Sequence, residues 1–178
     1  MNLWHDVPRG EDAPEKINVI IEIPKGSHNK YEIDKETGLI KLDRANYGPT
    51  PYFFDYGFVP QTLWEDDDPL DVVLLTTYPL HPGVLVEVRP VAVMEMIDDG
   101  DSDYKVIGVP AEDRRFESVQ DLPDVNEHFK RELQHFFETV KALKGKEVPV
   151  TIHGFKGAKD AKEAVTKSIE LYNEKFAK

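Results

Sequence analysis

The sequence contains no cysteine, and its 178 residues include only three methionines and two tryptophans. Without cysteine the chain can form no disulfide scaffold, no thiolate zinc site and no thiol nucleophile. This absence suits a reducing compartment, and we expect a cytoplasmic protein. No apolar run is longer than four residues, as at 72–75 and 91–94. The sequence therefore predicts neither a transmembrane helix nor the apolar segment of a signal peptide.

Positive charge is also scarce. The chain has 22 Lys and Arg residues against 34 Asp and Glu residues, which gives a net charge of −12. Nucleic acids and anionic membrane surfaces are bound by basic faces, so this balance argues against both as partners. An anionic substrate would have to be held by a local group of cations or by metal ions.

Several common catalytic and binding motifs are missing. The sequence has no glycine-rich phosphate loop, no HExxH among its six histidines and no serine in a nucleophile elbow. Its acidic segments do not fit an EF-hand, because the sixth residue counted from Asp66 or Asp99 is Asp71 or Tyr104, where the loop requires glycine. His135 lies one residue from an apolar stripe, which predicts a partly buried structural histidine.

Short β-rich segments occupy the first three quarters of the chain. Pro90 interrupts one of them and predicts a bulge or an edge. Many short strands without helices between them indicate a small barrel or sandwich rather than a parallel βαβ sheet. No internal repeat or linker divides the chain, so we expect a single domain over 1–178. The predicted strands are Ile17–Ile23, 30–33, 39–42, 52–59, 71–77, 84–96, 105–109 and 147–153.

Two amphipathic helices are predicted near the end of the chain, over 125–143 and 158–176. In both, apolar residues recur at steps of three and four. In the first segment, Val140 falls on the apolar stripe and is therefore expected in the core. The fold class that follows is α+β and mostly β, a barrel or sandwich with two helices packed on it.

Acidic residues concentrate in two predicted turns. The segment 65–71 has five carboxylates in seven positions, and 98–103 has four in six. Each lies at the end of a predicted strand, where side chains can converge on one point. Mg²⁺ prefers oxygen ligands and needs only a few carboxylates, because it keeps several waters. Clustering alone leaves open the alternative of two solvated loops.

Cationic and phenolic side chains form a second set of candidates. Ammonium, guanidinium and phenol groups that face a carboxylate–metal cluster would suit a polyphosphate, whose oxygens need both metal ions and point charges. Taken singly, each is better explained as a surface residue. The set is Lys30, Glu32 and Arg44 on an early hairpin, Tyr52 and Tyr56 on an aromatic strand, Lys105 after the second acidic turn and Lys141 on the first helix.

These motifs together closely resemble the soluble family I inorganic pyrophosphatases of the bacterial and archaeal type. The resemblance runs from about residue 14 to residue 173 through IIEIPKGSHNKYEID, LDR, DYGF, EDDDPLDV, DDGDSDYK and HFFETVK. The pattern D-x-D-P-x-D at 66–71 is the signature of that family. The resemblance implies an OB-like five-stranded barrel with additional strands and two helices, a homo-hexamer, and Mg²⁺-dependent hydrolysis of pyrophosphate to two orthophosphates, without a phosphoenzyme, by a water that two metal ions bridge.

The resemblance also assigns roles by motif position. Asp68 would be the general base for the attacking water. The metal ligands would be Asp66, Asp71 and Asp103 for the tightest ion, Asp71 for a second ion, Asp98 and Asp103 for ions that arrive with substrate, and Glu22 in an outer shell. The phosphoryl groups would be held by Lys30, Arg44, Tyr56, Lys105 and Lys141, with Glu32, Tyr52 and Asp99 in support.

Three positions depart from the family pattern. Asp67 stands where glycine is usual, and we expect its side chain to face solvent. Phe53 replaces a common proline, which predicts a change in packing. Val140 replaces the tyrosine that usually precedes the phosphate-binding lysine, so one hydroxyl donor is missing.

Two alternatives to an active pyrophosphatase stay open. The departures at Asp67 and Val140 would suit a catalytically weakened relative that still binds divalent metal. The fold alone would suit an OB-type nucleic-acid binder, but the charge of −12 argues against it.

Overall fold

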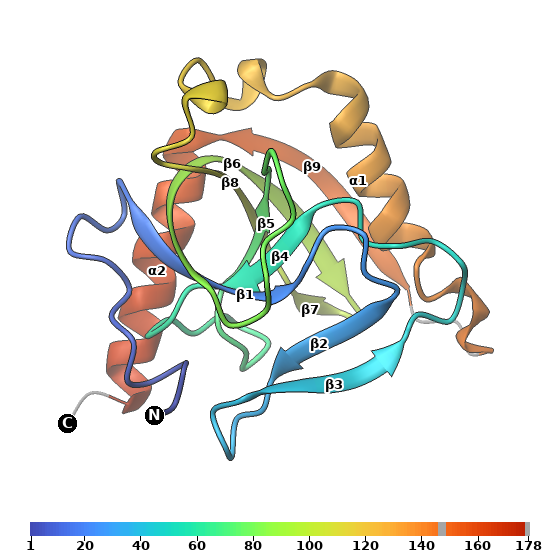
Figure 1. Cartoon of the computed structure of the whole chain (residues 1–178), viewed down its shortest axis with the longest axis horizontal. Helices are drawn as coiled ribbons and strands as arrows, with labels where there is room; N and C mark the ends of the chain where they lie inside the picture. The colour runs from blue at the N-terminus through green and yellow to red at the C-terminus, as the bar shows by residue number, and fades with distance from the viewer. Residues whose placement is uncertain (146–148, 177–178) are drawn as a thin grey trace.

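The computed structural model describes residues 1–145 and 149–176 (Figure 1). Within these residues, β-strands dominate the chain and two α-helices follow late, as predicted. The strands are β1 (Ile17–Ile23), β2 (Asn29–Ile33), β3 (Ile40–Ala45), β4 (Asp55–Phe58), β5 (Asp71–Leu74), β6 (Leu85–Asp98), β7 (Asp101–Ser102), β8 (Lys105–Pro110) and β9 (Val150–Gly157). The helices are α1 (Glu127–Thr139) and α2 (Ala158–Phe176), with short 3-10 helices η1 (Arg114–Phe116), η2 (Leu122–Asp124) and η3 (Ala142–Lys144).

Five strands close into a barrel. β1 pairs with β4 and β6, β4 pairs with β5, and β8 pairs with β5 and β6; only the β5–β8 pair is parallel. Closure removes the free edges that an open sheet would expose. This arrangement confirms the predicted OB-like barrel in a mostly-β α+β fold. The register of β6 shifts between Pro90 and Ala92, in agreement with the bulge predicted at the proline.

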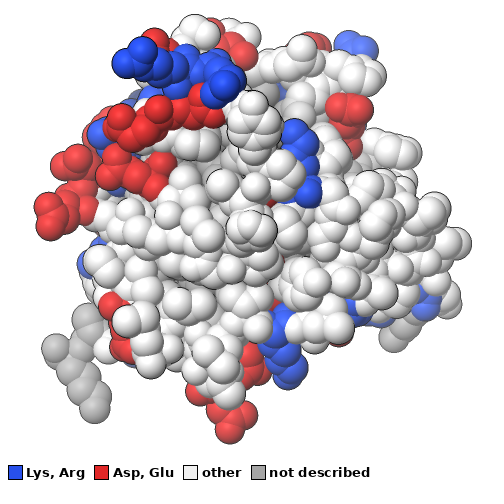
Figure 2. Space-filling model, in the orientation of Figure 1, with Lys and Arg blue, Asp and Glu red and all other residues white. Residues whose placement is uncertain are grey.

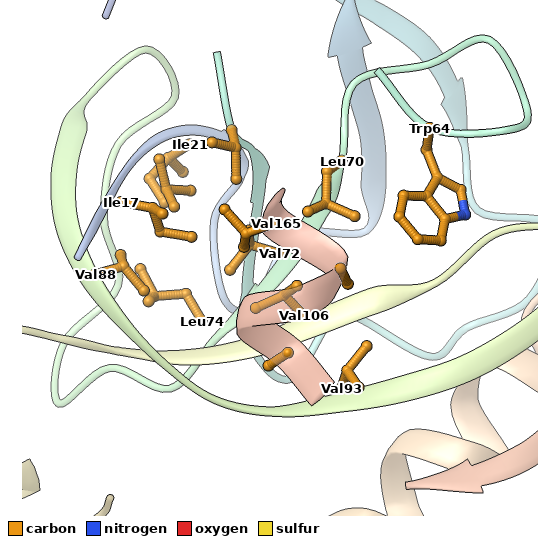
Figure 3. Packing of buried hydrophobic residues seen from close by; sticks show 14 residues of the cluster. Ile17, Ile21, Trp64, Leu70, Val72, Leu74, Val88, Val93, Val106 and Val165 are labelled. Carbon is orange, nitrogen blue, oxygen red and sulfur yellow. The ribbon is translucent and has the colours of Figure 1, made fainter. Parts of the chain in front are cut away.

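Alternation along the strands explains the barrel interior. Ile17, Val19 and Ile21 of β1 are fully buried and belong to one cluster with alternate residues of the neighbouring strands. Helix α2 adds Val165 to this cluster, and Figure 3 shows Val165 close to the labelled barrel residues. The apolar stripe of α2 therefore packs against the barrel core.

Helix α1 covers a different face of the sheet. Leu133 and Phe136 pack in a second cluster with Val73 of β5 and Ile107 of β8. Val72 belongs to the first cluster, so β5 is buried on both faces. This double burial explains why its sequence is continuously apolar instead of alternating.

The β2–β3 hairpin forms a separate two-stranded sheet beside the barrel (Figure 1). Its turn is closed by hydrogen bonds that Asp34 accepts from the backbone N–H and the hydroxyl of Thr37, and Gly38 follows with φ of 73°. The hairpin was predicted from this turn sequence. It provides one wall of the candidate site described below.

Some predicted boundaries were wrong. The aromatic strand is confined to β4, so Tyr52 precedes it. Helix α1 ends at Thr139, which places Lys141 after the helix and not on it, and His135 is exposed instead of partly buried. The short strand β7 was not predicted. The strand predicted from residue 147 is observed as β9 from Val150, and residues 147–148 lie outside the described part of the chain.

Charge is unevenly distributed over the surface. Figure 2 shows a face whose Lys, Arg, Asp and Glu side chains lie mainly near the rim, whereas its centre is largely uncharged. Among the described helices, none combines the length and the apolar character needed to cross a bilayer.

Candidate active site

A cavity of about 820 Å³ opens between the barrel, the β2–β3 hairpin and the segment after α1. Both acidic turns and the predicted cations contribute to its wall, although they are far apart in the sequence. All fourteen residues that were predicted for the site line this cavity, namely Glu22, Lys30, Glu32, Arg44, Tyr52, Tyr56, Asp66, Asp68, Asp71, Asp98, Asp99, Asp103, Lys105 and Lys141. The structure thus brings the predicted residues together, whereas their individual roles stay predictions.

The parallel pairing of β5 with β8 joins the two acidic turns. Asp71 is the first residue of β5, Lys105 is the first residue of β8, and the two are register partners. The Lys105 ammonium donates to Asp71 at 2.5 Å and to Asp103 at 2.6 Å. Lys105 is only 3% exposed, so its charge is neutralised by these carboxylates and not by water.

A tryptophan connects the same two turns on their outer side. The indole N–H of Trp64 donates to the Ser102 hydroxyl at 3.1 Å, and its ring stacks on Tyr104 at a centroid distance of 5.2 Å. Trp64 is buried and lies just before the first acidic segment. The two acidic turns are therefore held together by packing as well as by charge.

Strands β1 and β4 supply the floor of the cavity. The Tyr56 hydroxyl donates to Asp71 at 2.6 Å. The next residue in β4 is Gly57. A Cβ at this position would lie 2.1 Å from the carbonyl oxygen of Ile20, so only glycine lets β4 approach β1 this closely. Glu22 is buried and accepts a hydrogen bond from the backbone N–H of Ile33 at 2.7 Å, which ties β1 to the hairpin.

The hairpin presents two cations to the cavity. Lys30 and Arg44 are register partners across β2 and β3. Lys30 donates to Glu32 at 2.8 Å and to Asp43 at 3.1 Å, and Arg44 contacts Asp43 at 2.6 Å. These ion pairs hold both cations near the cavity wall.

The electrostatics of the cavity indicate more negative charge than its cations neutralise. Burial, followed by repulsion from Asp103 and Asp71, raises the pKa of Asp66 to about 8. Burial and the neighbouring Asp71 raise the pKa of Glu22 well above its usual value. Burial opposes the charged form of Lys105, but Asp103 and Asp71 outweigh it and raise the pKa of the ammonium. A bound cation would relieve this repulsion.

The carboxylates of the cavity have the chemistry that a divalent ion requires. In the ranges 1–145 and 149–176, no three His, Cys, Asp or Glu side chains already form a metal-binding group, and the Lys105 ammonium lies between Asp71 and Asp103. Within the same ranges, Oδ1 of Asp98 is a buried oxygen without a hydrogen-bond partner, while Oδ2 pairs with Lys141 at 2.6 Å. A buried unpaired carboxylate oxygen is unfavourable unless a cation binds it. The carboxylate-rich donor set and this oxygen fit a hard divalent ion.

Val140 packs against the second apolar cluster, so the core position that its periodicity predicted is confirmed in part. It forms the C-cap of α1, is half-buried and lines the cavity directly before Lys141. Its φ of −59° and ψ of −27° are helical and its N–H donates to the carbonyl of Phe136, so the helical geometry of α1 extends to this residue. The residue that replaces the family tyrosine therefore lies at the cavity wall.

The sequence interpretation missed Lys35 and Lys144, which also line the cavity. Lys35 extends from the turn of the hairpin, and its ammonium lies 2.5 Å from Oδ1 of Asp68. It also donates to the carbonyl of Asp67 at 2.9 Å. The only sequence signal was a lysine in a polar turn, which does not identify a partner 33 residues away.

Comparison with known proteins adds independent information. The family model described as "Inorganic pyrophosphatase" matches residues 19–173. A curated inorganic pyrophosphatase of Thermus thermophilus is 53% identical over 169 residues, which cover 93% of this chain and 95% of the relative. One of Haloferax volcanii is 43% identical over 178 residues, with 99% of both chains covered. A crystal structure of inorganic pyrophosphatase from Thermus thermophilus superposes with a TM-score of 0.93 at 50% identity and covers 97% of this chain and 99% of that one.

Proposed function

The chain belongs to the inorganic pyrophosphatase family and is an enzyme that hydrolyses pyrophosphate, and we propose that it does so with Mg²⁺ by direct attack of water. One observation carries the proposal for the site. Lys105, buried between Asp71 and Asp103, joins two distant acidic turns inside a cavity that further cations also line. This combination suits a substrate that carries several negative charges and is bound together with cations.

The protein residues have separate roles in this proposal. Asp68 accepts a proton from the attacking water, whose oxygen forms a bond to one phosphorus while the bridging P–O bond breaks. The leaving phosphate takes the bonding electron pair. Lys30, Arg44, Tyr56, Lys105 and Lys141 orient the two phosphoryl groups and stabilise their charge. Phosphoryl transfer needs mainly such positioning and charge neutralisation, so no phosphoenzyme is required.

The metal ligands would be Asp66, Asp71, Asp98 and Asp103, with Glu22 outside them and Glu32, Tyr52 and Asp99 in support. When bound, Mg²⁺ would lower the pKa of a coordinated water and neutralise phosphoryl charge. Two observations support this set: burial together with repulsion from Asp103 and Asp71 raises the pKa of Asp66, and one oxygen of Asp98 is buried and unpaired.

Metal removal tests the proposal directly. We expect the chelated, metal-free protein to release no measurable phosphate from pyrophosphate, because the substrate and the acidic wall then repel one another. Titration with Mg²⁺ should restore activity along a saturable curve. Phosphate release is measured colorimetrically at constant ionic strength.

Two controls accompany this titration. Na⁺ at equal ionic strength should not restore activity, and dialysis against Mg²⁺ after chelation should restore it fully. Undiminished hydrolysis in the chelated protein would contradict the proposed metal requirement.

Replacing Val140 by tyrosine tests the effect of the missing hydroxyl. A tyrosine at this cavity position would donate to a phosphoryl oxygen, and one hydrogen bond to a charged group contributes about 1–3 kcal/mol. We therefore expect Val140→Tyr to lower KM and to strengthen inhibition by orthophosphate. Val140→Phe is the matched control, since it adds the ring without the hydroxyl. If both variants behave like the unchanged protein, the hydroxyl contributes nothing here.

The remaining proposals concern the protein as a whole. We propose that residues 1–178 form one pyrophosphatase domain, that the protein is cytoplasmic and that it assembles as a homo-hexamer. The uncharged centre of the face in Figure 2 and exposed apolar residues such as Tyr78 (70% exposed) and Leu85 (51%) support contact between copies. Neither a nucleic acid nor a membrane is proposed as a partner.

A further inference from the structure

The loop that carries Asp66 and Asp68 has an unusual backbone conformation at its centre. Asp67 has φ of 66°, in the left-handed region that glycine adopts readily and other residues rarely adopt. The turn is closed by hydrogen bonds from the N–H of Trp64 to the carbonyl of Asp68 at 2.7 Å and from the N–H of Asp67 to the carbonyl of Trp64 at 3.2 Å. This conformation sets the directions of the two flanking carboxylates, and with aspartate at its centre it needs support from outside the loop.

Helix α2 provides such support. The Asp67 side chain faces away from the cavity lining and accepts a hydrogen bond from the Lys175 ammonium at 2.7 Å. Two turns earlier on the helix, Lys167 pairs with Glu65, and its ammonium lies 4.9 Å from the centre of the Trp64 ring. The second half of α2 therefore contacts the outer side of the loop at two positions, Glu65 and Asp67.

We propose that Lys175 is a positioning residue for hydrolysis, which acts through Asp67. Its ion pair stabilises the left-handed conformation at Asp67 and thereby holds Asp66 and Asp68 toward the cavity. The inference rests on the proposed roles of these two carboxylates. It makes the end of α2 a functional element, although Lys175 does not line the cavity.

The pair is exposed, which determines where its effect should appear. The side chains of Lys175 and Asp67 are 47% and 74% exposed. Exposed ion pairs add little to global stability, so we expect the free energy of unfolding to change little. The conformation of this short loop depends on far fewer contacts than the stability of the whole protein does. One ion pair therefore contributes a larger fraction of the energy that holds the loop.

A double-mutant cycle tests the coupling. The four proteins are the unchanged chain, Lys175→Met, Asp67→Gly and the double variant, each measured for Mg²⁺ affinity by calorimetry and for kcat and KM. Lys175→Met should weaken Mg²⁺ binding and lower kcat by about two- to five-fold, the range that one exposed ion pair provides. Asp67→Gly should tolerate the loss of Lys175, because glycine needs no support at this φ. The double variant should therefore behave like Asp67→Gly alone.

Two further variants control for charge. Lys159→Met removes a lysine of the same helix that is 89% exposed and forms an ion pair with Glu163, and it should leave all three quantities unchanged. Lys175→Arg keeps the cation and should retain the behaviour of the unchanged chain. An equal effect of Lys175→Met in both backgrounds, or an effect in neither, would overturn the inference. If Asp66→Asn and Asp68→Asn impair the enzyme while the cycle shows no coupling, the proposed function stands and only this inference is wrong.

Discussion

Asp68→Asn will slow pyrophosphate hydrolysis by about 10²–10⁴-fold, the contribution that a positioned general base makes. Asparagine has nearly the same shape but cannot accept the proton of the attacking water. Asp68 lines the cavity on the exposed side of the first acidic turn, with 51% of its side chain accessible, and Lys35 holds one of its oxygens at 2.5 Å. The loss should fall on kcat, because the predicted metal ligands and phosphate-binding cations are unchanged.

Steady-state rates of phosphate release at saturating Mg²⁺ measure this loss. Asp101→Asn is the matched control, since Asp101 is an exposed carboxylate of the cavity wall to which no role is assigned. It removes the same charge and should reduce kcat by less than a general base does. If Asp68→Asn retains the full kcat, the assignment of the base is wrong.

Asp103→Asn will abolish tight Mg²⁺ binding. Loss of a partner outside the metal's own ligands already weakens metal affinity by about 10–100-fold, so removal of a direct carboxylate ligand should weaken it by at least that much. After burial, repulsion from Asp103 is the largest cause of the raised pKa of Asp66, so the two carboxylates share one electrostatic environment. Calorimetric titration with Mg²⁺ measures the loss.

The same substitution removes a partner of the buried Lys105, and this effect has to be separated from metal binding. Lys105 keeps its contact with Asp71, so we expect the variant to fold. Cooperative thermal unfolding without Mg²⁺ verifies that it does. A folded Asp103→Asn variant that binds Mg²⁺ as tightly as the unchanged chain would contradict the assignment.

Local patterns predicted most of the strands and the two helices, whereas the OB-like barrel and the set of residues in the cavity were predicted from the family resemblance. A β-branched, mostly apolar run defines β1, and the acidic segments lie where β5 and β8 begin. The register that sets Asp71 beside Lys105 is a consequence of strand pairing. The resemblance predicted that Asp71 and Lys105 belong to one site, but it did not predict that they are paired across two parallel strands.

Features that depend on distant contacts could not be predicted. Asp67 has a left-handed φ, and its ion-pair partner Lys175 lies 108 positions further along the sequence. Val140 lies both against the apolar cluster and at the cavity wall, and this depends on how α1 packs on the sheet, which helical periodicity alone does not determine. His135 lies within α1, and its exposure shows that it falls outside the buried stripe of the helix. Local patterns specify elements, whereas long-range contacts specify how the ends of those elements are oriented.

The central claim is that the two acidic turns bind the same metal ion. Calorimetric titration of Mg²⁺ into Asp66→Asn, Asp103→Asn and the double variant tests it most directly. If the turns share an ion, each single substitution eliminates the tight binding event, and the double substitution causes no further loss. If each single variant instead retains part of the tight binding and only the double variant loses all of it, the turns bind separate ions and the account is wrong.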